Sequence, residues 1–142
     1  MSHHCSCLLI QCMDFRMVKE TMNWLKEKDL IGDCDIVSLA GSSKSLIDEN
    51  DLEVKKFILK QIETSYNLHN MRKIILLHHS DCGAYNSSYH FRDEEEEFSK
   101  QLDDMQAAEE TLKNLFEDIE IIKIWAKMKD NKGNEVEFSE IN

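Results

Sequence analysis

Apolar residues along the chain form two kinds of segment: continuous runs, and runs whose apolar positions recur at helical spacing. The continuous runs have the length of buried β-strands and are bounded by polar residues. We expect strands at residues 5–11, 35–39, 73–78 and 119–125. The third run reads KIILLH, which is typical of a parallel strand covered on both faces.

Helical spacing appears between these runs. Val18, Met22 and Leu25 predict a helix over residues 17–28, with Gly32 as a stop signal beyond it. Asn50 and Glu53 form a candidate capping box for a second helix, which continues to Ser65. Five apolar residues mark a third helix: Phe98, Leu102, Met105, Leu112 and Leu115. After the last strand we expect a turn at residues 131–133 and a short edge strand.

Strands that alternate with helices imply right-handed crossovers and a parallel arrangement. The expected fold class is therefore α/β, with a mostly parallel central sheet of about four strands plus an edge strand, and with helices on both faces. A chain of 142 residues has the size of one domain, so we expect a single domain over residues 1–142.

Charge and cysteine content narrow the function. The formal net charge of -11 disfavours nucleic acid as a partner, because phosphate contacts need a basic surface. No segment approaches the roughly 20 apolar residues of a membrane span, and we expect a cytoplasmic protein without a membrane partner. Five cysteines without a secretion signal favour metal or thiol chemistry over disulfides. The acidic run 93–97 is interpreted as a solvated helix start.

Three residues of zinc-binding type follow two of the expected strands. Cys12 comes just after the first strand, and His79 and Cys82 come just after the third. Ligands bind at the carboxyl ends of parallel strands, and three protein ligands leave a zinc ion with an open fourth position. His78 is an alternative ligand, but adjacent strand residues point to opposite faces and we favour His79. His78 is then a packed, hydrogen-bonded histidine or a proton relay.

Two other uses of the cysteines remain open. His3, His4, Cys5 and Cys7 could form a second metal site, although Cys5 and Cys7 on one face of a strand would also pack well as apolar residues. Cys12 or Cys82 could instead be a catalytic thiol if a basic neighbour lowered its pKa. Zinc uses all of the residues at the strand ends together, and we prefer it.

Three motifs follow one another along the chain: CMDFR at residues 12–16, LAGSS at residues 39–43 and HHSDCGA at residues 78–84. Their order and spacing resemble the β-class carbonic anhydrases, in particular the short members that lack a long N-terminal helical arm. The resemblance implies a Zn²⁺ cofactor held by Cys12, His79 and Cys82. It also implies reversible hydration of carbon dioxide to bicarbonate by a zinc-bound hydroxide, in a homodimer or higher homo-oligomer.

The resemblance further implies catalytic roles for Asp14 and Arg16. Asp14 would accept a hydrogen bond from the hydroxide, or bind zinc itself, and Arg16 would hold Asp14 ionised through a bidentate contact. Ser80 and Asp81 would brace the loop, and Gly83 would allow a tight turn.

The sequence departs from the family where Ser38 and Leu39 replace a pair that is often Arg-Asn. This departure and the short chain motivate the second of two alternative functions, whereas the first follows from relatives in the family that act on other linear molecules. One is a zinc hydrolase of carbonyl sulfide or carbon disulfide, and the other is a non-catalytic regulatory or structural zinc module.

Overall fold

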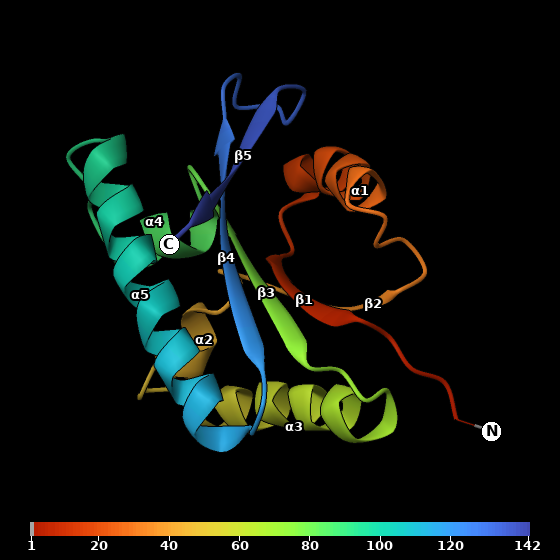
Figure 1. The fold of residues 1–142 in the computed structure, drawn as a ribbon. Coiled ribbons are helices and arrows are strands. Elements are labelled where there is room, and N and C mark those ends of the chain that lie inside the picture. Colours follow the sequence, from red (N-terminus) through yellow and green to blue (C-terminus); the bar gives the residue numbers. More distant parts are fainter. Residues whose placement is uncertain (1) are drawn as a thin grey trace.

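The continuous apolar runs form one sheet in the computed structural model, which describes residues 2–142 (Figure 1). Its strands are β1 (Cys7–Cys12), β2 (Cys34–Leu39), β3 (Lys73–His79), β4 (Glu120–Met128) and β5 (Val136–Ile141). Within the described residues the sheet has five strands in the order β2-β1-β3-β4-β5. β1, β2, β3 and β4 pair in parallel, and β5 pairs antiparallel with β4. The predicted α/β class and mostly parallel sheet are confirmed.

Helices cover both faces of the sheet, as predicted. The single 3₁₀ turn η1 (Phe15–Met17) leads into α1 (Val18–Glu27), which lies on one face (Figure 1). The other face carries α2 (Lys44–Ile47), α3 (Leu52–Leu68) and α5 (Glu94–Leu115), while α4 (Gly83–Ser88) follows the end of β3. Among the described residues, none of the helices combines the length and apolar character that crossing a bilayer requires.

The core has two halves because strands buried on both faces send alternate side chains to opposite sides. The half beneath α3 and α5 is formed by eleven buried residues: Leu8, Ile10, Leu46, Ile58, Ile62, Met71, Ile74, Leu76, Ala108, Leu112 and Ile121. The half beneath α1 is formed by ten others: Cys7, Leu9, Met17, Trp24, Leu25, Ile75, Leu77, Ile124, Ala126 and Met128.

Several local predictions need correction. The N-cap of α3 is Asp51, whose side chain accepts a hydrogen bond from the Val54 backbone, and not Asn50. The N-terminal strand begins at Cys7, so Cys5 lies in the segment before it and packs with the opposite half of the core from Cys7. The short helices α2 and α4 were not predicted, since four and six residues are too few to show a helical period.

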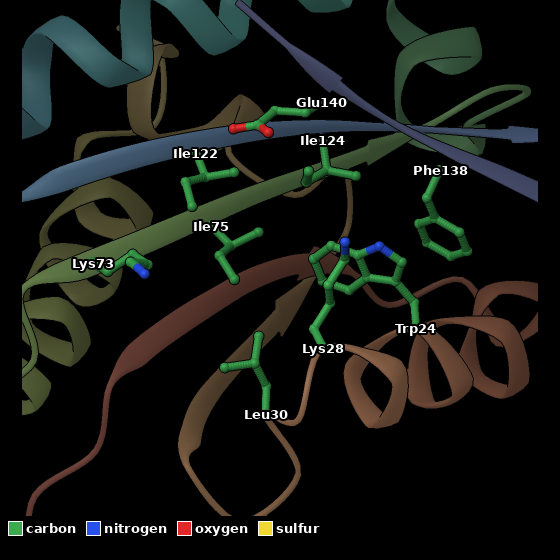
Figure 2. Close-up of a pocket in the computed structure, with 9 residues that line it drawn as sticks. All are labelled: Trp24, Lys28, Leu30, Lys73, Ile75, Ile122, Ile124, Phe138 and Glu140. Carbon is green, nitrogen blue, oxygen red and sulfur yellow. The ribbon is translucent and has the colours of Figure 1, made fainter.

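α1 covers only part of its face of the sheet. Figure 2 shows the groove that remains beside it, with a volume of about 290 Å³. Trp24 from α1 stacks on Phe138 from β5 at one end of this groove, with ring centroids 5.6 Å apart. The groove is lined by Trp24, Lys28, Leu30, Lys73, Ile75, Ile122, Ile124, Phe138 and Glu140.

The strand order places a crevice at the carboxyl ends of β1 and β3. β1 is the second strand of the sheet, and the chain crosses from it to β2 on one side and reaches β3 on the other. The two crossovers run on opposite faces, through α1 and through α2 and α3 (Figure 1). Such a reversal opens a crevice beyond the strand ends, where ligands of α/β proteins bind.

Candidate metal centre

Cys12, His79 and Cys82 meet in this crevice. Cys12 is the last residue of β1, His79 is the last residue of β3, and Cys82 caps the start of α4. Their donor atoms all lie within 4.8 Å of one another, and the two sulfur atoms are 3.9 Å apart. His79 and Cys82 are buried, whereas Cys12 is half-buried. Two thiols and an imidazole at this separation are a suitable ligand set for a tetrahedral zinc ion.

The imidazole of His79 is fixed with one nitrogen free. Its Nδ1 lies 2.7 Å from the backbone oxygen of Ser80, and because a carbonyl only accepts, Nδ1 carries the proton and donates it. In the neutral imidazole Nε2 then presents a lone pair, and this atom is buried with no hydrogen-bond partner among residues 2–142. Buried polar atoms are rarely left unpaired, and an unpaired histidine nitrogen beside two thiols fits a metal ligand.

The two thiols have pKa values displaced in opposite directions. The pKa of Cys12 is lowered to about 4, first because its sulfur shares a hydrogen bond with the Cys82 thiol, and further because His79 lies beside it. The pKa of Cys82 is raised, first by the same hydrogen bond with Cys12 and then by burial. The cluster thus favours at least one thiolate, which is the form that binds metals.

Asp14, in the loop after β1, also lies beside the candidate ligands. Its Oδ2 lies 3.7 Å from His79 Nε2. Arg16 donates hydrogen bonds to this carboxylate. Its Nη2 lies 2.7 Å from Oδ2, and its Nε lies 3.1 Å from Oδ1 and 3.2 Å from Oδ2. The Arg16 backbone N–H also donates to Asp14 Oδ1, at 2.9 Å. These hydrogen bonds hold the pKa of Asp14 below its ordinary value, so the carboxylate is ionised at neutral pH.

Arg16 also binds two other segments of the chain. Nη1 donates to Asp81 Oδ2 at 3.0 Å, and Nη2 donates to the Asp81 backbone oxygen at 2.9 Å. Nη1 lies 3.4 Å from the backbone oxygen of Asn131, in the loop between β4 and β5. That loop approaches so closely that a Cβ on Gly133 would lie 1.8 Å from the Arg16 backbone oxygen. Arg16 therefore joins the loops after β1, β3 and β4.

Side chains of α5 form hydrogen bonds with the loop that carries Cys82. Glu97 Oε1 accepts the Asp81 N–H at 2.9 Å, and Oε2 accepts the Cys82 N–H at 3.0 Å. Gln101 Nε2 donates to the His79 backbone oxygen and to Glu97, both at 3.0 Å. One turn on, Asp104 accepts a hydrogen bond from the buried Tyr85 hydroxyl of α4 at 2.8 Å. Glu97, Gln101 and Asp104 are all buried.

This buried polar row corrects the interpretation of residues 93–97 as a solvated helix start. Asp93 does cap α5 and its neighbours are exposed, but Glu97 is only 5% exposed. The signal that could have found the row is its spacing of four and three residues, which places Glu97, Gln101 and Asp104 on one side of a helix, next to the apolar Met105 and Ala108.

His78 lies outside the candidate ligand set and is fully hydrogen-bonded. Ser43 Oγ lies 2.6 Å from Nε2, and Gln101 Oε1 lies 2.9 Å from Nδ1. Burial lowers the pKa of His78 to about 4, so it is neutral at pH 7. These contacts support a packing role, in which His78 ties β3 to the start of α2 and to α5.

The loop after β3 turns at a different residue from the one predicted. Asp81 has a φ of 54°, in the left-handed region, whereas Gly83 does not and begins α4. Asp tolerates this conformation, and its carboxylate is anchored by Arg16 and by Asn86. Ser80 does brace the loop, because its Oγ accepts the Met128 N–H at 2.8 Å.

The N-terminal group of His3, His4, Cys5 and Cys7 is not assembled as one donor set in the described chain. Cys7 is completely buried in the core half beneath α1, whereas Cys5 contacts Asp35 on the other side. The expectation that Cys5 and Cys7 pack together on one face of a strand is therefore wrong.

An open pocket of about 670 Å³ reaches the candidate centre at Cys12. Its wall includes Cys12, Asp14 and Arg16, together with the apolar side chains of Met13 and Phe15. Small molecules can therefore reach the cluster from solvent.

Comparisons with known proteins place the chain in context. A family described as "Putative carbonic anhydrase" matches residues 2–137. A tetrameric β-carbonic anhydrase from Sordaria macrospora has a similar structure, with a TM-score of 0.67, 15% identity, and coverage of 99% of this chain and 82% of that one. An apo form of carbon disulfide hydrolase is also similar, with a TM-score of 0.51, 17% identity, and coverage of 100% and 89%.

A curated relative from Rickettsia bellii, described as an uncharacterized protein, is 45% identical over 80 residues. The match covers 56% of this chain and 49% of that protein. The chain thus matches about half the length of its relative.

Proposed function

The chain belongs to the family described as "Putative carbonic anhydrase", and from this premise we propose that it catalyses the zinc-dependent, reversible hydration of carbon dioxide to bicarbonate. The observation that carries the proposal is the unpaired, buried Nε2 of His79 facing two thiols beside an ionised, anchored carboxylate. Cys12, His79 and Cys82 would hold the zinc. When bound, zinc acts as a Lewis acid that lowers the pKa of a water molecule towards neutrality.

Asp14 and Arg16 then have distinct roles. Asp14 accepts a hydrogen bond from the reacting water and orients its lone pair towards carbon dioxide in the open pocket. Arg16 keeps Asp14 ionised and stops it from rotating towards the metal, because the guanidinium contacts both carboxylate oxygens. This pairing supports the arrangement in which the fourth metal position stays free, over the one in which Asp14 occupies it.

Stopped-flow measurement of carbon dioxide hydration by the zinc-loaded chain tests the proposal. We expect a zinc-dependent rate, lowered by about 10²-fold or more in Asp14→Asn, because the negative charge is lost and one of the two acceptor oxygens becomes an N–H donor. Cys82→Ser should lose activity together with the zinc ion of the candidate centre, whereas Asp103→Asn, on the exposed side of α5, should retain both. A zinc-loaded chain with no rate above background from neutral to alkaline pH would leave the non-catalytic zinc module as the better hypothesis.

Carbon disulfide or carbonyl sulfide is the second candidate substrate, favoured by the structural likeness to a carbon disulfide hydrolase. Both are linear molecules like carbon dioxide, and the same candidate ligands would serve. Sulfide release by the zinc-loaded chain, compared with its carbon dioxide hydration rate, decides between the substrates.

We also propose that the chain forms a homodimer that covers the mouth of the pocket. Phe15 is 83% exposed and Met13 is 64% exposed, and both line the pocket. Exposed apolar side chains at a site mark an interface, and a similar carbonic anhydrase is tetrameric. Light scattering should give the dimer mass for the chain and the monomer mass for Phe15→Glu; a monomeric parent chain would refute this. The cytoplasmic location stays a prediction.

A further inference from the structure

A second group of metal-ligand type lies at the amino ends of the strands, away from the crevice. Cys5 precedes β1, Asp35 is the second residue of β2, and His69 follows α3. Their donor atoms lie within 4.8 Å of one another, and all three residues are half-buried. The hydration proposal uses none of them.

The distances within this group approach those of a tetrahedral zinc site. With Zn–O and Zn–N bonds near 2.0 Å and a Zn–S bond near 2.3 Å, sulfur and oxygen ligands are about 3.5 Å apart, and nitrogen and oxygen ligands about 3.3 Å. Cys5 Sγ lies 3.5 Å from Asp35 Oδ2. His69 Nδ1 lies 2.6 Å from the same oxygen, as a hydrogen bond. Metal would replace that shared proton and move the two groups apart by about 0.7 Å.

The ring of His3 lies beside that of His69, although His3 is not among the three residues whose donor atoms lie within 4.8 Å of one another. The ring centroids of the two histidines are 4.7 Å apart and the rings are inclined at 51°. Two imidazoles on one tetrahedral zinc hold their ring centres about 5 Å apart. His3 is exposed, and its segment is anchored two residues later, where the Cys5 N–H donates to the His69 backbone oxygen at 3.0 Å.

The surroundings orient the group and balance its charge. Ser65 Oγ donates to Asp35 Oδ2 at 2.7 Å, which is the kind of outer contact that fixes a ligand carboxylate. The His69 side chain is 26% exposed and that of Asp35 is 31% exposed, so an ion can enter from solvent. A thiolate and a carboxylate together neutralise a divalent cation, and the formal net charge of -11 attracts one.

We propose that His3, Cys5, Asp35 and His69 form a second binding site for a divalent transition metal ion of the zinc class. One thiolate, one carboxylate and two imidazoles are donors that suit Zn²⁺ rather than Mg²⁺ or Ca²⁺. The four ligands close the coordination shell, which is typical of a structural site. The ion would pin the segment before β1 to β2 and to the end of α3.

Zinc stoichiometry tests this proposal without measuring activity. The untagged chain of 142 residues is loaded with excess Zn²⁺, passed over a desalting column, and analysed for zinc and protein. We expect about two zinc ions per chain, and about one in Cys5→Ser or His69→Ala. Cys34→Ser is the matched control, because Cys34 is a neighbouring half-buried cysteine outside the group, and it should keep two.

The variant Cys82→Ser distinguishes zinc bound at the second site from zinc bound at the candidate catalytic centre. That variant should keep about one zinc ion, and Cys5→Ser/Cys82→Ser should keep none. The second site therefore succeeds or fails independently of carbon dioxide hydration. One zinc ion in the parent chain that Cys5→Ser does not remove would overturn the proposal, as would two ions in Cys5→Ser.

His3→Ala is the variant for the case in which Cys5→Ser fails to fold. His3 is exposed and precedes every strand and helix, so its loss should leave the fold intact. We expect zinc at the second site to bind about 10-fold or more weakly in competition with a chromophoric chelator, because one ligand of four is lost. An unchanged affinity would overturn the proposal.

Discussion

Glu97 shows how far a single side chain can differ from the segment around it. It sits in a run of acidic residues at an exposed helix start, yet its two oxygens accept three hydrogen bonds from Asp81, Cys82 and Gln101. The loop with Cys82 has no regular secondary structure before α4, so these bonds satisfy N–H groups that would otherwise be buried and unpaired. Glu97 positions the candidate ligand without touching the metal.

Glu97→Gln should therefore weaken both the fold and zinc binding. The amide nitrogen would face a backbone N–H, which leaves a buried donor unpaired at a cost of about 1–3 kcal/mol in the free energy of unfolding. Zinc affinity should fall by about 10–100-fold, as for other partners that orient ligands. Urea unfolding and chelator competition measure the two effects. Glu95→Gln, exposed on the same turn, should change neither; equal effects in both variants would contradict the positioning role.

Gly133 has an equally strict requirement. It has a φ of +78° and no room for a Cβ against Arg16, whereas Gly32 has a φ of +83° and no heavy atom within 4 Å of such a Cβ among the described residues. Gly32→Ala should cost about 1 kcal/mol from backbone strain alone. Gly133→Ala should cost about 2 kcal/mol or more, because the clash adds to the strain. The difference between the urea midpoints of the two variants measures the effect of the close contact with Arg16. Equal midpoints would refute a contribution from that contact.

The strands and long helices could be predicted from the sequence because each carries its own periodic or continuous apolar signal. The four parallel strands and the three long helices were found in this way, with ends misplaced by a few residues. α2 and α4 carry no such signal, and their positions depend on the contacts of Ser43 with His78 and of Tyr85 with Asp104. The local spacing of residues does not reveal which distant segments contact one another.

An ion pair between α5 and β4 gives a pH-dependent prediction. Lys123 in β4 is 7% exposed, and its Nζ lies 2.9 Å from Glu109 Oε1. Burial opposes ionisation of Glu109, but Lys123 and Lys113 outweigh it, so the pKa of Glu109 is lowered. A carboxylate with a lowered pKa stabilises the fold above its unfolded pKa of about 4.3, and this stability disappears as pH falls through the folded pKa.

Glu109→Gln should then cost about 1–3 kcal/mol at pH 7, because it leaves the Lys123 ammonium buried without a counter-charge. The difference from the parent chain should shrink as pH drops below the folded pKa of Glu109. Urea unfolding at neutral and acidic pH measures this. A difference that stays constant with pH would show that the charge of Glu109 contributes nothing.

The whole molecule brings the candidate site together through its strand order. The sequence predicted that Cys12, His79 and Cys82 meet, because parallel strands end at one edge of a sheet, and the structure places their donor atoms together. Their role as zinc ligands stays a proposal. For the second group the sequence offered Cys5 as a possible ligand but not Asp35 or His69, because these come from distant segments that share no motif with it. The single-domain organisation stays a prediction.

Each half of the core contains or borders one tryptophan, whose fluorescence can report on the unfolding of that half. Its two tryptophans lie on opposite faces: Trp24 stacks on Phe138 beneath α1, and Trp125 meets the ring of Phe98 on α5 with centroids 4.9 Å apart. Trp24→Phe and Trp125→Phe each leave one fluorophore, which reports a single face. If both faces unfold as one cooperative unit, the fluorescence midpoint of each variant will match its own circular dichroism midpoint. A mismatch would mean that one layer of helices separates from the sheet before the other.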